Sequence, residues 1–202
     1  MKSRLEKAEE RRGKILAAAR QLFTRHGFHG TGVAQIASES GVKVGQLYRD
    51  FACKEDIIAA LVEPDVGVFL DEQALALAVE AQDFHLVRTW IRRFIEDDST
   101  LDDDFALMAE TIAEATRNLR VAAIVHRVDA RVRGSILTAL AVLAPGETKA
   151  PQRLHLADFI MAIGHGVWFR RISDPNVDHV GLSGYVGGLI DSELQRIIVS
   201  PA

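Results

Sequence analysis

Three polar side chains able to read DNA bases occur within seven residues of the sequence. Lys43, Gln46 and Arg49 fall at positions that a short predicted helix over about 44–51 leaves exposed. A glutamine can make two hydrogen bonds to adenine, and a lysine or arginine can reach guanine or a phosphate. Leu47 lies between them and is expected in the core. This stretch is therefore a candidate surface for binding nucleic acid.

The histidines and paired glutamates do not combine into a clear catalytic set. His155 and His165 are ten residues apart, too far along one helix to share a metal ion. Glu110 and Glu114 are one helical turn apart and could frame a metal or acid–base site with His126 or His165. Such groups are more often surface charges or core histidines with satisfied hydrogen bonds. We expect no catalytic residues and no metal site.

Two other reactive features also have simpler interpretations. Cys53, beside Lys54, could be a redox-sensitive thiolate, or it could be a small residue that caps a helix. The glycines within 181–188 resemble a phosphate-binding loop only superficially, because no predicted strand precedes them. We expect that the protein is not an enzyme and has no cofactor apart from a small-molecule effector.

Charge is divided unevenly along the chain, whose formal net charge is −4. Residues 1–54 contain 11 Lys and Arg against 5 Asp and Glu, a net charge of +6. Residues 55–202 contain 13 against 23, a net charge of −10. A basic head on an acidic body favours a polyanionic partner for the head, although a solvated charged tail would give the same totals.

The length of 202 residues, with 48% hydrophobic residues, is sufficient for one large domain or two small ones with a real core. No run approaches the roughly 18 apolar residues of a membrane span. The charged segment from Lys2 to Lys14 has no apolar stretch typical of a signal peptide, and a single cysteine forms no intrachain disulfide. We therefore expect a cytoplasmic protein.

The first 51 residues predict three helices. Ile15, Ala19, Leu22 and Phe23 form one apolar stripe of a helix over about 9–26, and Gly27 is placed to end it. Thr31 is expected to cap a short helix over about 32–40. The turn at 41–42 then leads to the helix over about 44–51. This arrangement is typical of a helix-turn-helix unit.

The rest of the chain also predicts helices and no convincing strand. A long element over about 54–81 is expected to kink or break near Glu63, before Pro64. Further apolar periodicities and breaking residues predict helices over about 83–97, 102–117, 119–143, 151–172 and 180–199. The fold class is therefore all-α.

An ordered set of residues over some 50 positions resembles the DNA-binding head of the TetR (tetracycline repressor) family. The matching residues are Ile15–Ala19, Leu22-Phe23, Gly27-Phe28, Thr31, Ile36-Ala37, Gly41-Val42, Gly45–Phe51 and Lys54-Glu55. Four residues depart from the pattern: Gly32, where Thr or Ser is common, Lys43 and Cys53, where a capping Ser is frequent, and Asp50, where His is frequent. The resemblance implies a DNA-binding domain over 9–69, with its helix-turn-helix motif at 32–51, and a helical effector-binding and dimerisation domain over 70–202.

In such a unit the second helix of the motif enters the major groove, and helix N-termini hold phosphates. Gly45 lets the backbone approach DNA, and the Tyr48 ring seals the core while its hydroxyl reaches a phosphate, as the resemblance implies. Thr31 and Lys54 are expected to hold phosphates. The predicted DNA-binding residues are Thr31, Lys43, Val44, Gly45, Gln46, Tyr48, Arg49 and Lys54.

Large side chains gather on the predicted helices of the body, where they could line an effector pocket or form an ordinary core. Two histidines on the same helices could supply its polar groups. The expected ligand is largely apolar or aromatic, with one or two hydrogen-bonding groups. The predicted effector-binding residues are Trp90, Phe94, Phe105, Met108, His126, Phe159, His165 and Trp168.

The last two predicted helices favour a homodimer through about 151–199. Gly181, Gly184 and Gly188 form a stripe of small residues, and the preceding helix is apolar on more than one side. The resemblance implies the same interface. We therefore expect a dimeric repressor that binds a palindromic operator in double-stranded DNA and is released by a small molecule. The alternatives are a helical enzyme or ligand carrier with a similar head, and a nucleoid or partitioning protein without an effector.

Overall fold

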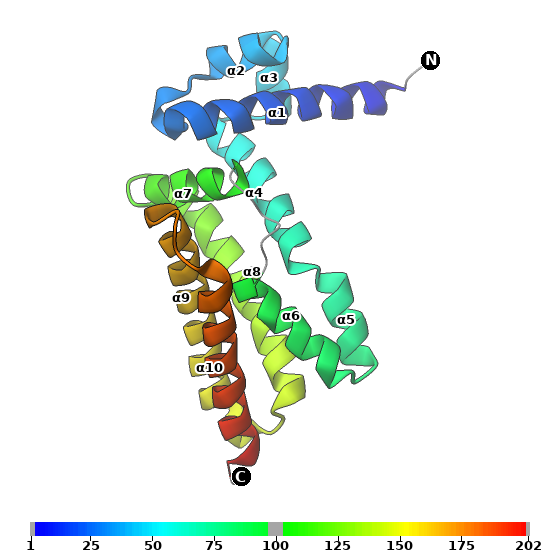
Figure 1. The fold of residues 1–202 in the computed structure, drawn as a ribbon. Coiled ribbons are helices and arrows are strands. Elements are labelled where there is room, and N and C mark those ends of the chain that lie inside the picture. The colour runs from blue at the N-terminus through cyan, green and yellow to red at the C-terminus, as the bar shows by residue number, and fades with distance from the viewer. Residues whose placement is uncertain (1–2, 97–102, 201–202) are drawn as a thin grey trace. The chain divides into compact units, whose positions relative to one another are not determined.

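The computed structural model describes residues 3–96 and 103–200, and the fold over these ranges is all-α, as predicted (Figure 1). The side chains of 103–105 are not described. No strand occurs within the described ranges, and none of their helices is both long and apolar enough to cross a membrane. The helices are α1 (Arg4–Gly30), α2 (Val33–Ser40), α3 (Val44–Asp50), α4 (Lys54–Leu70), α5 (Glu72–Glu80), α6 (Phe84–Glu96), α7 (Asp103–Ala115), α8 (Leu119–Leu143), the short 3-10 helix η1 (Glu147–Lys149), α9 (Ala150–Ser173) and α10 (His179–Val199).

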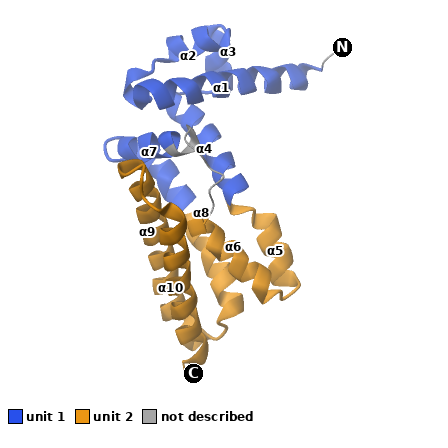
Figure 2. Ribbon diagram, viewed as in Figure 1, with its two compact units in different colours: residues 1–69, 100–129 blue, residues 70–99, 130–202 orange. Residues whose placement is uncertain are grey.

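The chain divides into two compact units (Figure 2). Unit 1 contains residues 1–69 and 100–129, and unit 2 contains residues 70–99 and 130–202. The predicted boundary after residue 69 coincides with a unit boundary. Residues 100–129 nevertheless join the first unit, where α7 packs against α1. The division into a DNA-binding domain and an effector domain stays a prediction about function.

Helix α1 begins earlier than predicted because of a reciprocal cap. The Glu6 backbone N–H donates to Ser3 Oγ at 3.1 Å, and the Ser3 N–H donates to Glu6 Oε2 at 2.8 Å. This capping box satisfies two N–H groups that a helix start leaves unpaired. At the other end the helix is interrupted at Gly27, which has a φ of 70° that favours glycine. Gly27 therefore interrupts the helix where the sequence predicts.

Helices α2 and α3 form the predicted helix-turn-helix. Gly41 ends α2 in the left-handed conformation with a φ of 67°, and Val42 follows in the core. Ile36 of α2 and Leu47 of α3 are almost fully buried. Helix α2 packs against both α3 and α1. The predicted cap of α2 is wrong, however. Gly32 occupies the cap position and no side chain caps that helix.

Helix α4 continues through Pro64, so the proline does not break the helix, and the alternative of a kink at this point stays a prediction. Pro64 is exposed, whereas Val62 and Val66 on the opposite face are buried. Packing of that face outweighs the hydrogen bond that proline cannot make. The chain breaks instead at Asp71, which has a φ of 44° and caps α5 by accepting the Ala74 N–H.

In unit 2, α6 packs against α5, α9 and α10. Its buried residues Val87, Ile91 and Ile95 follow the predicted helical spacing. Pro151 lies in the first turn of α9, as predicted, where a missing N–H costs nothing. The bounds of α6, α8, α9 and α10 agree with the sequence prediction to within about two residues.

Candidate nucleic-acid interface and effector site

The side of α3 opposite the core is the candidate reading surface. Leu47 is 1% exposed and anchors the helix, as predicted. Gln46 is half-buried. A β-carbon at Gly45 would meet no atom within 4 Å, so the backbone there is open to a close partner. The exposed predicted residues are Lys43, Val44, Gly45, Tyr48 and Arg49.

Tyr48 differs from its predicted placement. Its side chain is 52% exposed, so the ring does not seal the core. The physical reason is that Leu47, the preceding residue, already occupies the position of this short helix that faces the core. About half of the Tyr48 surface is therefore accessible at the candidate surface.

The C-terminal end of α3 is tied to α1 by ionic contacts that the sequence analysis missed. Arg11 donates through Nε to Asp50 Oδ2 at 2.6 Å and through Nη2 to Asp50 Oδ1 at 2.8 Å. Arg12 donates through Nη1 to the Asp50 backbone oxygen at 2.8 Å, and its guanidinium lies 4.3 Å from the centre of the Phe51 ring. The hydrogen bond from Arg11 lowers the pKa of the Asp50 carboxyl. We call Arg11, Arg12 and Asp50 the α1–α3 clamp.

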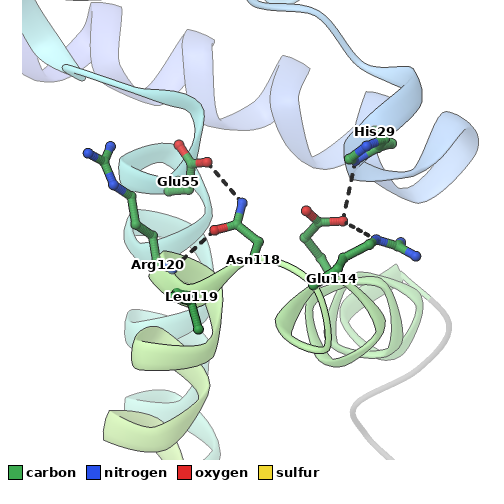
Figure 3. Close-up of a pocket in the computed structure, with 7 residues that line it drawn as sticks. His29, Glu55, Glu114, Asn118, Leu119 and Arg120 are labelled. Carbon is green, nitrogen blue, oxygen red and sulfur yellow. Dashed lines mark hydrogen bonds and ion pairs between the residues drawn. The ribbon is translucent and has the colours of Figure 1, made fainter.

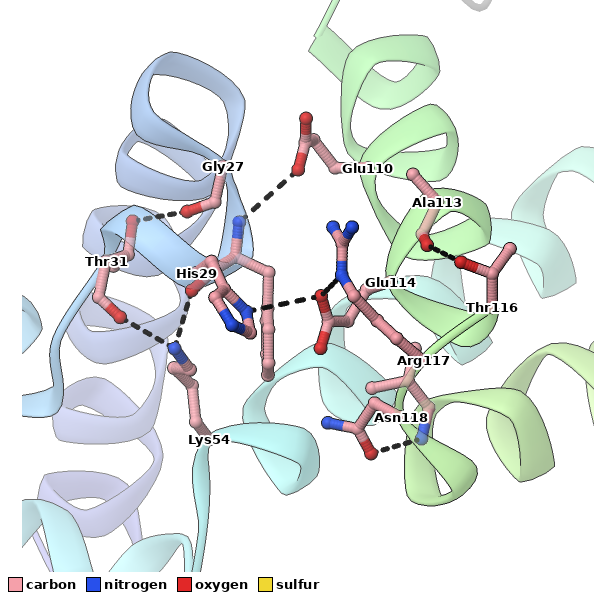
Figure 4. Close-up of polar contacts among 12 residues, drawn as sticks. Gly27, His29, Thr31, Lys54, Glu110, Ala113, Glu114, Thr116, Arg117 and Asn118 are labelled. Atoms are coloured by element: carbon pink, nitrogen blue, oxygen red, sulfur yellow. Dashed lines mark hydrogen bonds and ion pairs between the residues drawn. The ribbon is translucent and has the colours of Figure 1, made fainter.

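Thr31 and Lys54 hold the fold of the head rather than presenting free groups to phosphates (Figure 4). Thr31 is completely buried, and its hydroxyl donates to the Leu22 and Gly27 carbonyls at 3.1 and 2.8 Å. A phosphate contact by this hydroxyl is therefore wrong. Both carbonyls belong to α1, and that of Gly27 lies at the interruption of the helix.

Lys54 supplies the neighbouring donor. Its Nζ donates to the Phe28 carbonyl and to the Thr31 carbonyl, the latter at 2.8 Å, and lies 4.0 Å from the centre of the Phe28 ring. Burial lowers the pKa of this ammonium group. In this structure Lys54 caps two backbone carbonyls, and its contact with a phosphate stays a prediction.

An open pocket in unit 1 lies beside this region (Figure 3). Its lining combines acidic and basic groups from α1, α4, α7 and α8, so it is a strongly polar site. Its floor includes Glu114, which is 2% exposed. The lining residues are His29, Glu55, Glu114, Arg117, Asn118, Leu119 and Arg120.

The two glutamates of α7 dock on the end of α1. Glu114 Oε2 accepts from Arg117 Nε at 2.8 Å and lies 3.4 Å from His29 Nδ1, and Glu110 accepts the Phe28 N–H at 3.4 Å (Figure 4). Burial alone would raise the pKa of Glu114, but hydrogen bonds from Arg117 and Asn118 and the nearby charges lower it overall. The two glutamates therefore contact α1 and Arg117 rather than His126 or His165, which the sequence suggested as partners. No group of three residues that could hold a metal ion occurs within the described ranges.

The predicted effector residues occupy mixed environments. Trp90 is 5% exposed, and its indole N–H donates to the Leu70 carbonyl. Its ring packs edge-on against the Phe94 ring, with 4.9 Å between the ring centres. His126 and His165 were predicted to supply polar groups inside a pocket. Both are exposed in this structure. Met108, Phe159 and Trp168 are half-buried, and the Phe105 side chain lies outside the described residues. The polar pocket of unit 1 shares no residue with this set.

Two family models match separate parts of the chain. Residues 15–61 match the model of bacterial regulatory proteins of the tetR family, and residues 85–185, half of the chain, match the C-terminal model of BetI-type transcriptional repressors. The chain belongs to the TetR family. The first match contains the whole α2–turn–α3 motif.

Individual relatives agree with this TetR assignment. The HTH-type transcriptional regulator UidR of Escherichia coli is 32% identical over 117 residues, which span 57% of this chain and 57% of UidR. The structure of GusR from Salmonella enterica has a TM-score of 0.72 and 24% identity, and covers 92% of this chain and 95% of GusR. The structure of a SmeT–triclosan complex has a TM-score of 0.70 and 18% identity. The match covers 95% of this chain and 98% of SmeT. These structural matches show the fold.

In this TetR chain, α9 and α10 leave small and apolar residues exposed. A β-carbon at Gly184 or Gly188 would meet no atom within 4 Å. Beside them on α10, Tyr185 is 68% exposed and Leu189 is 41% exposed, and Phe169 on α9 is 64% exposed. Of the glycine stripe predicted from the sequence, Gly184 and Gly188 are therefore open, whereas a β-carbon at Gly181 would meet the Asp178 side chain.

Proposed function

We propose that this protein is a sequence-specific DNA-binding transcriptional regulator whose helix α3 enters the major groove. The observation that carries the proposal is the exposed side of α3, where Lys43 and Arg49 flank the half-buried Gln46 within a helix-turn-helix. UidR, with which the chain shares 32% identity over 117 residues, is named as an HTH-type transcriptional regulator. The site of action would be the bacterial cytoplasm, where DNA is accessible.

Two copies of the chain would bind one palindromic operator. The exposed glycines of α10 allow a second helix to approach closely, and Tyr185, Leu189 and Phe169 supply apolar area around them. The proposed interface is the exposed face of α9 and α10 within residues 151–199. A two-fold dimer places one α3 on each half-site, about 34 Å apart for half-sites one helical turn apart.

A small molecule would release the operator, which makes the protein a repressor. SmeT, whose fold is similar, has been solved as a complex with triclosan, which supports binding of a small molecule by this chain as well. The half-buried Phe159 and Trp168, both in unit 2, remain the proposed lining for a largely apolar ligand. Binding would change the separation of the two α3 helices, with α4 as the connection that follows the motif in sequence.

The experiment is selection of duplexes from a random DNA library with the full-length protein. A palindromic consensus whose half-sites lie one helical turn apart supports the proposal. The control is the variant Lys43→Ala/Gln46→Ala, which changes two side chains of the reading surface and leaves Leu47 in place. Failure to enrich any sequence with the unmodified protein contradicts the proposal.

A further inference from the structure

We infer that Asp50 is a positioning residue for base recognition: through the α1–α3 clamp it fixes the orientation of α3 and so sets DNA specificity. This inference rests on the proposed function. Asp50 lies at the last position of α3, after the candidate base-reading residues. Its carboxylate would repel phosphates, so affinity for DNA alone gives no reason for an acidic residue there.

The clamp fixes the orientation of the Asp50 carboxylate as well as its distance from Arg11. Both carboxylate oxygens of Asp50 accept from the two nitrogens of one guanidinium, at 2.6 and 2.8 Å, and a planar pair of this kind allows little rotation. The Asp50 backbone oxygen is held separately by Arg12. The Asp50 side chain is only 9% exposed, so water competes weakly for these bonds.

Helix α3 needs such a restraint because it is short. It has seven residues, and only Leu47 among them is buried. A helix of this length is not stable alone, and one buried side chain leaves rotation about the helix axis weakly fixed. Val42 and Phe51, which flank the helix, are also buried, and the clamp adds a directional polar restraint at the last residue of α3. Base contacts need placement to within about 0.5 Å, so a small rotation of α3 would disturb all of them together.

The clamp also removes cationic charge from the DNA-binding head. Arg11 is neutralised by Asp50, and a seven-residue helix is about 10 Å long, so this charge pair lies within a Debye length of the reading surface. Removing the carboxylate would expose Arg11 to phosphates. Affinity for any DNA sequence would then rise, whereas the contacts that depend on orientation would weaken.

The test compares affinities of the full-length protein for its selected operator and for a scrambled duplex. In Asp50→Asn the affinity for the scrambled duplex rises and the operator preference falls about tenfold, the discrimination of one good base contact. In Arg11→Lys the charge is kept but the planar fork is lost, so the preference falls while the scrambled affinity stays constant.

The matched control is Asp65→Asn, which breaks the Arg20–Asp65 pair at 2.6 Å between α1 and α4, away from α3. A variant that only lowers the folded fraction reduces both affinities equally and leaves the preference unchanged. An Arg11→Lys preference within twofold of the unmodified protein, or an equal loss in the control, overturns the inference. If the unmodified protein does not prefer its selected operator, the proposed function itself fails.

Discussion

Replacing Lys54 with methionine separates a structural role from a phosphate contact. The Lys54 ammonium group donates to the Phe28 and Thr31 carbonyls and lies over the Phe28 ring. Methionine keeps most of the apolar stem and removes the charge and its hydrogen bonds. The two carbonyls at the interrupted end of α1 then lose their side-chain donor, and the fold of the head is weakened.

The magnitude follows from these contacts. A hydrogen bond to a charged group contributes about 1.5–3 kcal/mol, so two would give about 3–6 kcal/mol if fully buried and independent. Lys54 is only half-buried and shares one ammonium between two acceptors, and water can replace part of what is lost. We therefore expect Lys54→Met to lower the free energy of unfolding by about 2 kcal/mol.

Urea denaturation measures the stability, and operator titration of the folded protein measures DNA affinity. The matched control is Lys43→Met, because Lys43 is exposed on the reading surface. That variant should keep its stability, lose DNA affinity and show a shallower salt dependence. The reasoning is refuted if Lys54→Met changes stability by less than about 0.5 kcal/mol, within the range of a neutral surface substitution, yet loses as much DNA affinity as Lys43→Met.

Four further variants test separate parts of the molecule. Gln46→Ala should relax preference at one base pair of each half-site, measured by binding to single-base operator variants; an unchanged preference removes it from the reading set. Gly184→Leu should dissociate the dimer in sedimentation, because the added side chain overpacks the proposed interface at a position where a β-carbon meets no neighbouring atom of its own chain, whereas Gly134→Leu, equally open but outside that interface, should not. Glu114→Gln should lower stability near neutral pH. Because the folded pKa of Glu114 is below its ordinary value of 4.5, this difference should shrink as the pH falls below that value, and urea titrations showing it grow would contradict the argument. Trp168→Ala should keep operator affinity and lose release by the effector, once a compound screen has found one; normal release by that compound would exclude Trp168 from the pocket.

Local patterns in the sequence predicted most of the helices and the motif. Apolar spacing identified the buried faces of α1 and α6, and Gly27 and Gly41 marked the interruption and the turn because positive φ favours glycine. The earlier start of α1 also had a signal, since Ser3 and Glu6 have the spacing of a capping box. Pro64 misled because its effect depends on which face of α4 is buried.

The roles of polar residues were harder to predict because their partners are distant in sequence. Asp50 and Arg11 are 39 residues apart, and nothing in either local pattern indicates their pairing. Thr31 and Lys54 stand at helix starts, where a phosphate contact is physically reasonable. Only the packing of the head shows that nearby carbonyls already occupy both side chains.

The most direct test of the account is the affinity of the unmodified protein for its selected operator and for a scrambled duplex across a range of salt concentrations. Both affinities should fall as salt rises, because basic residues displace counterions from DNA. The operator should also be bound at least about 10³-fold more tightly than the scrambled duplex, as specific DNA-binding proteins require. Equal affinities for the two duplexes at every salt concentration would contradict the account.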